Sequence, residues 1–386
     1  MTVRWLLCLL VLTSVPASAA TASGSVDAVT YQIDTAHSGR STLSGFTGQL
    51  TQLWTRNLGG GISYPLIANG FVYVTVAAGT ATTLYALDPG SGNTVWQAPI
   101  PGDEPVSSLA YDDGQIFIVN LSGLVESFNA TTGTHRWNTQ LPREWFFPWP
   151  LIALRGTVFV GGQGTAGQLY ALSEKSGHIV WQAMVKDAGT PVAYNKLVAI
   201  TSPCEEYYGF AAKTGEWLWT DETLNSEGGG FTPVYYNGHL FVRDNCLSFS
   251  NRMVSAKSGS IGAKFKADLP PSFFTLDGND FIVALVSGSL TATPVKGTAP
   301  RWTFNGDGEL SSAPLVVDNY VIEGSASGNL YILDESDGHV ISSYGVGAGI
   351  EAPQEGGQTQ PLTGLGAANG VLIVPAGSQL VAFAPQ

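Results

Sequence analysis

Charged residues are scarce in this chain, and the two signs are unequal. Asp, Glu, Lys and Arg make up 12% of the 386 residues, with 17 basic against 30 acidic side chains and a net charge of −13. Such a surface repels polyanions, so nucleic acid and anionic membranes are excluded as expected partners. After the N-terminal segment no stretch approaches 18 consecutive apolar residues, which predicts a mature protein without a membrane span.

Cysteine is also rare. Cys8 lies in the apolar N-terminal segment, which leaves Cys204 and Cys246 for the mature chain. They are about one sequence repeat apart, and each follows a predicted strand, so they are expected on similar loops of neighbouring repeats. An oxidising compartment would permit a disulfide between them, which we predict. Two separate thiols remain the alternative, because Cα atoms more than ~7 Å apart cannot be bridged.

Sequence patterns typical of catalytic sites are missing. There is no Gly-x-Ser-x-Gly elbow, and the five histidines show no metal-ligand spacing. His135, His178 and His339 stand at or near turn glycines, which is typical of solvated turns. We therefore assign no catalytic residue from the sequence.

Residues 1–19 have the organisation of a signal peptide. Arg4 precedes a short apolar stretch, and Ala17-Ser18-Ala19 offers a small-residue cleavage site. No cysteine follows that site, so no lipid anchor is expected. We predict an exported protein, secreted or periplasmic, with a lead-in over 20–49 and one domain over 50–386. A monomer is expected.

One pattern recurs through the mature chain. Its clearest copies are Leu84–Trp96 and Leu169–Trp181, and its anchor glycines follow one another at intervals of 38 to 44 residues. The anchors are Gly92, Gly133, Gly177, Gly215, Gly259, Gly297 and Gly338. A truncated copy at 380–384 brings the repeats to eight. A period of this length is typical of a propeller or a solenoid.

Each repeat contains the signals of a four-stranded antiparallel sheet. A Pro- or Ser-rich entry precedes a short apolar strand, and a turn such as Asn69-Gly70 leads to a strand rich in β-branched and aromatic residues. A third strand, a turn with the anchor glycine and a fourth strand ending in Trp complete the unit. We expect the glycine to supply a positive φ, and the Trp to pack against the neighbouring blade.

The chain ends predict how the array closes. Residues 50–55 read as a Trp-bearing fourth strand with nothing before it, and residues 360–384 supply three strands without a fourth. Pairing of the two would close a ring without exposed sheet edges. The sequence therefore predicts an all-β, eight-bladed β-propeller whose N-terminal strand completes the last blade.

The segment Ala86-x-Asp88-x-x-x-Gly92-x-x-x-Trp96 resembles the Trp-docking repeat of pyrroloquinoline-quinone-type propellers. Pairs of the same spacing are Gly133 and Trp137, Gly177 and Trp181, and Gly215 and Trp219. Later copies depart from it, with Ala263, Arg301 and Ser342 where Trp would stand. The resemblance covers essentially the whole mature chain.

This resemblance has two functional branches. Quinoprotein dehydrogenases hold pyrroloquinoline quinone and Ca²⁺ in the channel, but they are longer and carry an adjacent Cys-Cys pair that is missing here. The other branch is non-catalytic and includes the lipoprotein subunit of the outer-membrane β-barrel assembly machinery. The chain is most similar to secreted, non-catalytic members. Quinone and Ca²⁺ remain the cofactors that the resemblance would supply.

Candidate binding residues fall on the loops between blades, which are expected on one face of the ring. These loops hold twelve acids and four bases, a surplus that would attract cations or basic partners. Asp307 and Glu309 represent this acidic rim. The alternative is that charges simply gather on loops.

Two further loops attract attention. Residues 145–149 contain four aromatics, of which Trp145, Phe146 and Trp149 could stack on a ligand; a hydrophobic plug is the alternative. Glu227 and Phe231 flank three glycines that would permit close approach of a ligand to the backbone.

We therefore favour a non-catalytic propeller that binds a protein, a polysaccharide or a small ligand at this acidic face. The alternative is a quinone-dependent oxidoreductase acting on alcohols or sugars.

Overall fold

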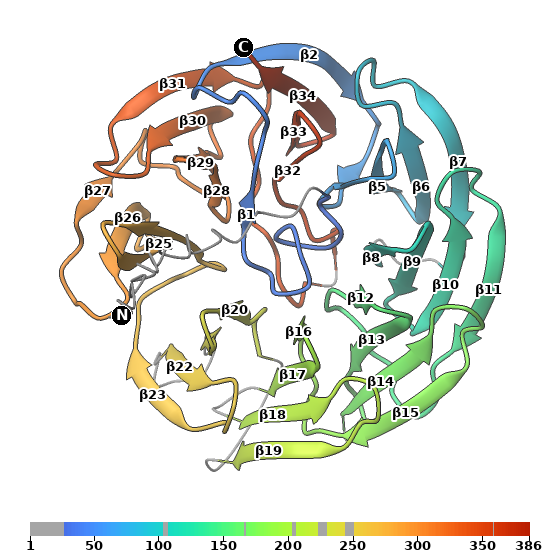
Figure 1. Ribbon diagram of the computed structural model, residues 1–386. Helices are drawn as coiled ribbons and strands as arrows, with labels where there is room; N and C mark the ends of the chain where they lie inside the picture. The colour runs from blue at the N-terminus through green and yellow to red at the C-terminus, as the bar shows by residue number, and fades with distance from the viewer. Residues whose placement is uncertain are drawn as a thin grey trace, which may run out of the picture.

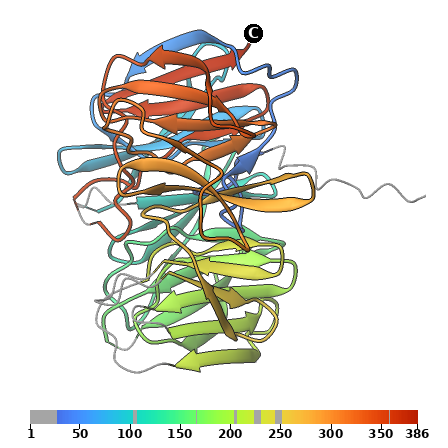
Figure 2. The same cartoon turned by 90° about the vertical axis from the view of Figure 1, so that its left-hand side faces the viewer.

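The chain forms a ring of eight antiparallel sheets, drawn in Figure 1 along the axis of the ring and in Figure 2 from the side. This computed structural model describes residues 27–102, 107–165, 167–202, 206–222, 230–243, 251–357 and 359–386. Within these ranges all regular structure is strand. No helix in the described ranges is long and apolar enough to cross a bilayer. The predicted eight-bladed propeller is confirmed.

Each blade takes its strands in chain order from the channel outward, except that blade 8 takes its outermost strand from the N-terminal part of the chain. Blade 1 contains β3 (Gly61–Ile62), β4 (Leu66–Ala68), β5 (Phe71–Ala78), β6 (Ala81–Leu87) and β7 (Thr94–Ile100), and blade 2 contains β8 (Ser107–Asp112), β9 (Gln115–Asn120), β10 (Leu124–Asn129) and β11 (His135–Gln140). Blade 3 contains β12 (Ile152–Leu154), β13 (Thr157–Gly162), β14 (Gln168–Ser173) and β15 (Ile179–Met184). Blade 4 contains β16 (Pro191–Tyr194), β17 (Leu197–Ser202), β18 (Glu206–Ala211) and β19 (Trp217–Glu222). In blade 1 the innermost strand is split, since β3 and β4 both pair with β5.

The second half of the ring repeats this order. Blade 5 contains β20 (Val234–Tyr236), β21 (His239–Val242), β22 (Arg252–Ser255) and β23 (Ile261–Lys264), and blade 6 contains β24 (Ser272–Leu276), β25 (Asn279–Val286), β26 (Ser289–Pro294) and β27 (Trp302–Phe304). Blade 7 contains β28 (Leu315–Val317), β29 (Tyr320–Gly324), β30 (Asn329–Asp334) and β31 (Val340–Gly345). Blade 8 contains β32 (Gly366–Ala368), β33 (Val371–Ala376), β34 (Gln379–Pro385) and β2 (Leu50–Asn57). A short strand from the lead-in, β1 (Arg40–Ser41), adds in parallel to β28.

The N-terminal strand completes blade 8, as the sequence predicts. β2 pairs with β34 in antiparallel register from Leu50 opposite Pro385 to Asn57 opposite Gln379. Figure 1 shows the two strands side by side beside the C-terminus. The last blade therefore joins both ends of the chain.

The turn between the first two strands of a blade carries the expected left-handed residues. Asn69, Asp113 and Asn237 have positive φ, and each is followed by a glycine that also has positive φ. Two consecutive positive φ angles define the type I′ turn, which matches the twist of a two-residue hairpin. These turns and the anchor-glycine hairpins lie on one face, called the turn face below. The inter-blade loops and the connections between the second and third strands form the opposite loop face.

The core is divided among the seams between blades. Leu84 and Ala86 of blade 1, for example, pack with Ile116 and Ile118 of blade 2 in one buried cluster. Ala86 and Ala171 are fully buried, so small side chains of the third strand stand where neighbouring blades pack.

A tryptophan on the outer strand fastens most blades to the next one. Trp96 donates its Nε1–H to the carbonyl oxygen of Ala130 at 2.9 Å, and its ring lies over Gly133 in the hairpin of blade 2. The same arrangement joins five other pairs of blades: Trp54 to Gly92, Trp137 to Gly177, Trp181 to Gly215, Trp219 to Gly259 and Trp302 to Gly338. The Trp residues therefore seal seams, as predicted.

The degenerate repeats depart from this scheme in two different ways. Trp302 docks on Gly338 although Arg301 stands at the expected position; Trp302 faces Ala292 of the third strand as Trp96 faces Ala86. Gly297 was predicted as an anchor and is not one: its φ is not positive, and a Cβ there would face Pro294 at 3.1 Å. Blades 5 and 7 present Ala263 and Ser342 instead of Trp. Ser342 Oγ donates to Gly48 O at 2.6 Å.

The glycine under each indole provides a test of this docking. Gly133 and Gly114 have φ of +70° and +73°, so alanine is strained at both. A Cβ on Gly133 would lie 2.6 Å from Trp96, whereas one on Gly114 would meet nothing within 4 Å. We expect Gly133→Ala to lower the free energy of unfolding by about 1–3 kcal/mol more than Gly114→Ala. Urea denaturation measures both; equal losses would contradict the docking role.

Candidate functional site

The lead-in occupies the centre of the ring, where Figure 1 shows it in blue around β1. Residues 28–41 form hydrogen bonds with the inner strands of seven blades: Ala28 with Ile67, Val29 with Tyr111, Thr30 with Leu151, Thr35 with Ala193, Ala36 with Tyr235, Gly39 with Ser272, and β1 with β28. Most of these contacts lie near the first turn of each blade. The lead-in therefore fills the channel from the turn face.

His37 lies at the middle of this segment and is fully buried. Its Nδ1 is 2.7 Å from the carbonyl oxygen of Tyr31, and its Nε2 is 3.0 Å from that of Pro191. Burial lowers the pKa of His37, although the two carbonyl groups oppose this by favouring the charged ring. With both nitrogens held by backbone, His37 fastens the lead-in to blade 4.

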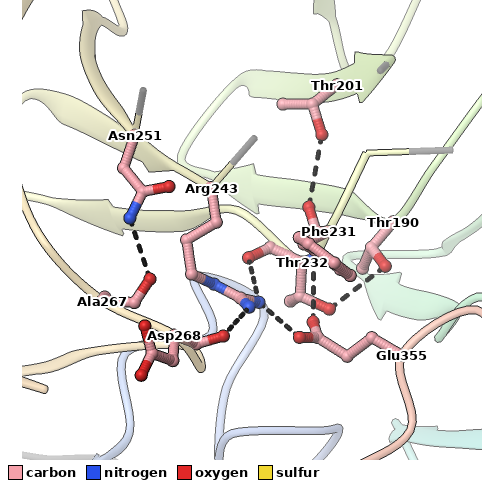
Figure 3. Close-up of polar contacts among 9 residues, drawn as sticks. All are labelled: Thr190, Thr201, Phe231, Thr232, Arg243, Asn251, Ala267, Asp268 and Glu355. Carbon is pink, nitrogen blue, oxygen red and sulfur yellow. Dashed lines mark hydrogen bonds and ion pairs between the residues drawn. The ribbon is translucent and has the colours of Figure 1, made fainter. Parts of the chain in front are cut away.

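A long loop enters the channel from the opposite, loop face. It connects β31 to β32 and carries Glu355, whose Oε2 lies 2.5 Å from Nη2 of Arg243 (Figure 3). Its Oε1 accepts a hydrogen bond from Thr232 N at 2.9 Å. Both side chains of the ion pair are 2% exposed. Arg243 follows β21, so the pair ties the blade 7–blade 8 loop to blade 5 across the channel.

The lead-in and the blade 7–blade 8 loop, which enter the channel from opposite faces, interact electrostatically. Tyr31 of the lead-in is completely buried; burial, followed by the charge of Glu355, raises the pKa of its hydroxyl well above the usual value. Arg243 also donates to Asp268 O at 3.0 Å, and its guanidinium lies 5.0 Å from the centre of the Phe231 ring. The channel therefore contains a packed polar network built from the chain itself.

This network bears on the quinone and Ca²⁺ that the resemblance would place in the channel. Carboxylate oxygens are suitable ligands for Ca²⁺, but both oxygens of Glu355 already bind Arg243 and Thr232. Tyr31 and His37 are packed on the same axis with no exposed surface to offer a flat ring. The described residues of the channel do not fit these two groups.

The aromatic loop of blade 3 is part buried and part exposed. Trp145 is 68% exposed and lies 6.1 Å from the Phe146 ring, whereas Phe147 is buried. Trp149 is also buried, and its ring covers Gly356 of the loop that enters the channel. Trp145 and Phe146 therefore remain available to a partner, and Trp149 helps to close the channel mouth.

Several acids of the predicted rim hold their own loops. Glu144 accepts a hydrogen bond from Thr165 N at 2.7 Å, and Asp268 accepts one from Ser287 N at 2.6 Å. Asp307 accepts hydrogen bonds from Ser325, Ser327 and Asn329. Glu309 and Glu351 are exposed. Part of the acidic surplus is thus structural.

The predicted signal peptide over residues 1–19 lies outside the described ranges, and so do three candidate site residues. These are Glu227, Cys204 and Cys246. The predicted disulfide and the predicted role of Glu227 stay predictions.

One group of possible metal ligands lies elsewhere, on the hairpin of blade 7. Asp334, Asp337 and His339 place one ligand atom each within 4.8 Å of one another. His339 Nδ1 is 2.6 Å from Asp337 Oδ1, a hydrogen bond that raises the pKa of the imidazole. The group is mostly exposed, and its hydrogen bonds stabilise the turn.

A cleft of about 510 Å³ opens on the loop face between blades 1 and 8. Glycines from both blades and polar residues of the blade 7–blade 8 loop line it; they include Gly60, Gly61, Gly79, Glu351, Gln354, Gln360, Gly377 and Ser378. Backbone groups close to glycine are accessible to a ligand. Glu351 is the acidic side chain at its wall.

The sequence reasoning missed Arg243 and the depth of the lead-in. A cation directly after the apolar strand His239–Val242 was a usable signal, because a charge beside a buried strand needs a partner. No local signal pairs it with Glu355, which is 112 residues away.

The ion pair predicts a coupled response to mutation. Arg243→Met leaves a buried carboxylate without its cation, and we expect a loss of about 3–5 kcal/mol in the free energy of unfolding. The double variant Arg243→Met with Glu355→Gln should lose clearly less than the sum of the single losses, because both charges are gone. Urea denaturation of the four proteins gives the coupling, and additive losses would show that the pair is not coupled.

Asp307 predicts a dependence on pH. Partial burial alone would raise its pKa, but hydrogen bonds from Ser327, Asn329 and Ser325 hold the pKa well below the usual value. The folded state therefore gains stability from this carboxylate above about pH 4 and loses it as the pH falls further. We expect the melting temperature of Asp307→Asn to be below that of the native protein at pH 7 and to approach it at pH 3. Glu309→Gln, in the same loop, is the control; an equal deficit at both pH values would contradict the prediction.

The chain aligns with curated relatives of two kinds. Tetrathionate hydrolase of Acidithiobacillus ferrooxidans is 29% identical over 190 residues, which are 45% of this chain and 37% of that protein. The chain thus matches little more than a third of the length of this relative. Outer membrane protein assembly factor BamB of Yersinia pestis is 24% identical over 314 residues, 79% of this chain and 68% of that protein.

Solved structures share the ring architecture. Quinohemoprotein alcohol dehydrogenase from Comamonas testosteroni superposes with a TM-score of 0.72, covering 95% of this chain and 81% of that one at 12% identity. Identity this low supports a common fold alone. A family model described as outer membrane protein assembly factor BamB matches residues 80–203 and 165–383. Because these matches cover well over half of the sequence, the chain belongs to this family of PQQ-like repeat β-propellers.

Proposed function

We propose that this protein is an exported, non-catalytic propeller that binds a protein partner through its loop face. The observation that carries the proposal is the filled channel. Tyr31 and His37 enter from one side and Glu355 from the other, so the axis on which related folds could hold a cofactor is packed with side chains. Binding surface is then left at the mouth of the ring and not within it.

The cleft between blades 1 and 8 is the described part of this surface. Its glycine-lined walls suit an extended segment that forms hydrogen bonds with backbone, and Glu351 favours a basic one. Trp145 adds an exposed aromatic ring on the same face, at blade 3, beside the half-buried ring of Phe146. Exposed aromatic rings are common anchors in protein interfaces.

The relatives are in keeping with this choice. One aligned relative is named an outer membrane protein assembly factor, and its alignment covers most of both chains. The N-terminal segment supports export of this chain. Polysaccharides and small ligands are tested as alternatives, and so is quinone-dependent oxidation.

A defined peptide tests the partner class. We expect a Lys-Ser-Lys-Ser-Lys-Ser peptide to bind in titration calorimetry, more weakly as salt is raised, whereas the matching Glu-Ser peptide should not bind. Glu351→Lys should weaken binding about tenfold. Glu216→Lys, at an exposed acid on the hairpin of blade 4 at the opposite turn face, is the matched control.

Two outcomes would overturn the proposal. Tight binding of oligosaccharides without binding of the peptide would assign the cleft to carbohydrate. Binding of pyrroloquinoline quinone with Ca²⁺, followed by dye-linked oxidation of alcohols or sugars, would make the protein an oxidoreductase.

A further inference from the structure

The seam between blades 5 and 6 is built differently from its neighbours. Six other seams contain an indole that lies over a hairpin glycine. Here the outer strand of blade 5 offers Ala263, and the hairpin of blade 6 lacks a left-handed anchor glycine. A hollow of about 280 Å³ lies at this seam. Lys264 and Phe265, the two residues that follow Ala263, line the hollow.

The walls of the hollow are mainly apolar. Phe265 of blade 5 faces Ile282, Val286 and Val295 of blade 6, while Thr293 adds a hydroxyl group. The first four also pack with the buried cluster of this seam. The outer strands of the two blades are the shortest outer strands described in the ring, with four residues in β23 and three in β27. The hollow therefore opens toward solvent at the side of the propeller.

The rim of the hollow is positively charged. Lys264 and Lys266 are exposed and line it directly. Elsewhere the chain is acidic, with a net charge of −13. Two lysines beside an apolar hollow favour an occupant that combines an apolar ring with negative charge.

We propose that this seam binds a tryptophan side chain presented by an acidic segment of a partner protein. The ring of the partner takes the place that the chain fills with its own indole at six other seams. A tryptophan buries ~150–250 Å², and one deeply seated aromatic ring is a common anchor in interfaces. The hollow has room for one such ring, and it is smaller than most sites for larger ligands. Acidic residues beside the ring face the two lysines.

The site is independent of the loop-face cleft. It lies on the outer side of blades 5 and 6, whereas the cleft lies between blades 1 and 8. Because the two sites are separate, variants at one site should leave binding at the other unchanged.

A fluorinated peptide tests the proposal with the full mature chain. The probe is acetyl-Asp-Glu-Trp-Glu-Asp-amide containing 5-fluorotryptophan, observed by fluorine NMR. We expect a saturable shift of its resonance, no binding of the same peptide with Ala for Trp, and weaker binding of a peptide with Lys for the acids.

Variants locate the probe. Ala263→Trp places an indole of the chain itself at this seam, and should weaken binding of the peptide at least about tenfold. Ala263→Ser should leave binding unchanged. Lys266→Glu should weaken binding about three- to tenfold, and Lys213→Glu, on the hairpin of blade 4, is the matched control. If Ala263→Trp does not fold, Thr293→Phe blocks the hollow from its other wall.

Three results would overturn the proposal. The first is unchanged binding to a folded blocking variant, and the second is equal binding of the alanine peptide. The third is a dimer of the native protein that Ala263→Trp abolishes, which would assign the hollow to a second copy of the chain.

Discussion

The ring depends on an indole placed over a glycine in left-handed conformation. A Cβ at such a position would lie inside the ring of Trp96, Trp137 or Trp181, so the close approach of neighbouring blades requires the missing side chain. The indole N–H meanwhile donates to a carbonyl of the same hairpin. A single contact thus satisfies a donor, buries a large ring and sets the spacing of two sheets. Because each seam is local, one seam can depart from the pattern without opening the ring.

Much of the fold could be predicted because its signals are local and repeated. Asn69-Gly70 and Asn237-Gly238 mark type I′ turns through their own backbone preferences, and the spacing of Gly92 and Trp96 reports one hairpin. Closure by residues 50–57 was predictable from counting strands. The docking of Trp302 was not, since its position was counted from Gly297, which is not the anchor of that hairpin.

The contents of the channel could not be predicted from the sequence. Residues 27–43 contain no strong strand pattern, because apart from the two residues of β1 they bind the inner strands through isolated contacts and not through a ladder. Arg243 and Glu355 meet across the ring although nothing in either local sequence refers to the other. For Asp307, sequence placed the residue on the loop face, but its Ser and Asn donors come from a separate connection of blade 7. Residues that meet only through tertiary structure produce no local or repeated pattern in the sequence.

Closure of the last blade has a consequence for the order of folding. β2 is among the first strands to be made, and its partner β34 is the last, so their pairing joins the two ends of the chain. Contacts between such distant residues are slow to form, because loop entropy must be lost before any bond is gained. Blades 1 to 7 can each form from adjacent residues, but the outer strand of blade 8 must wait. Synthesis therefore yields an open arc of sheets first, and the circle is completed as a final step after the C-terminal residues are available.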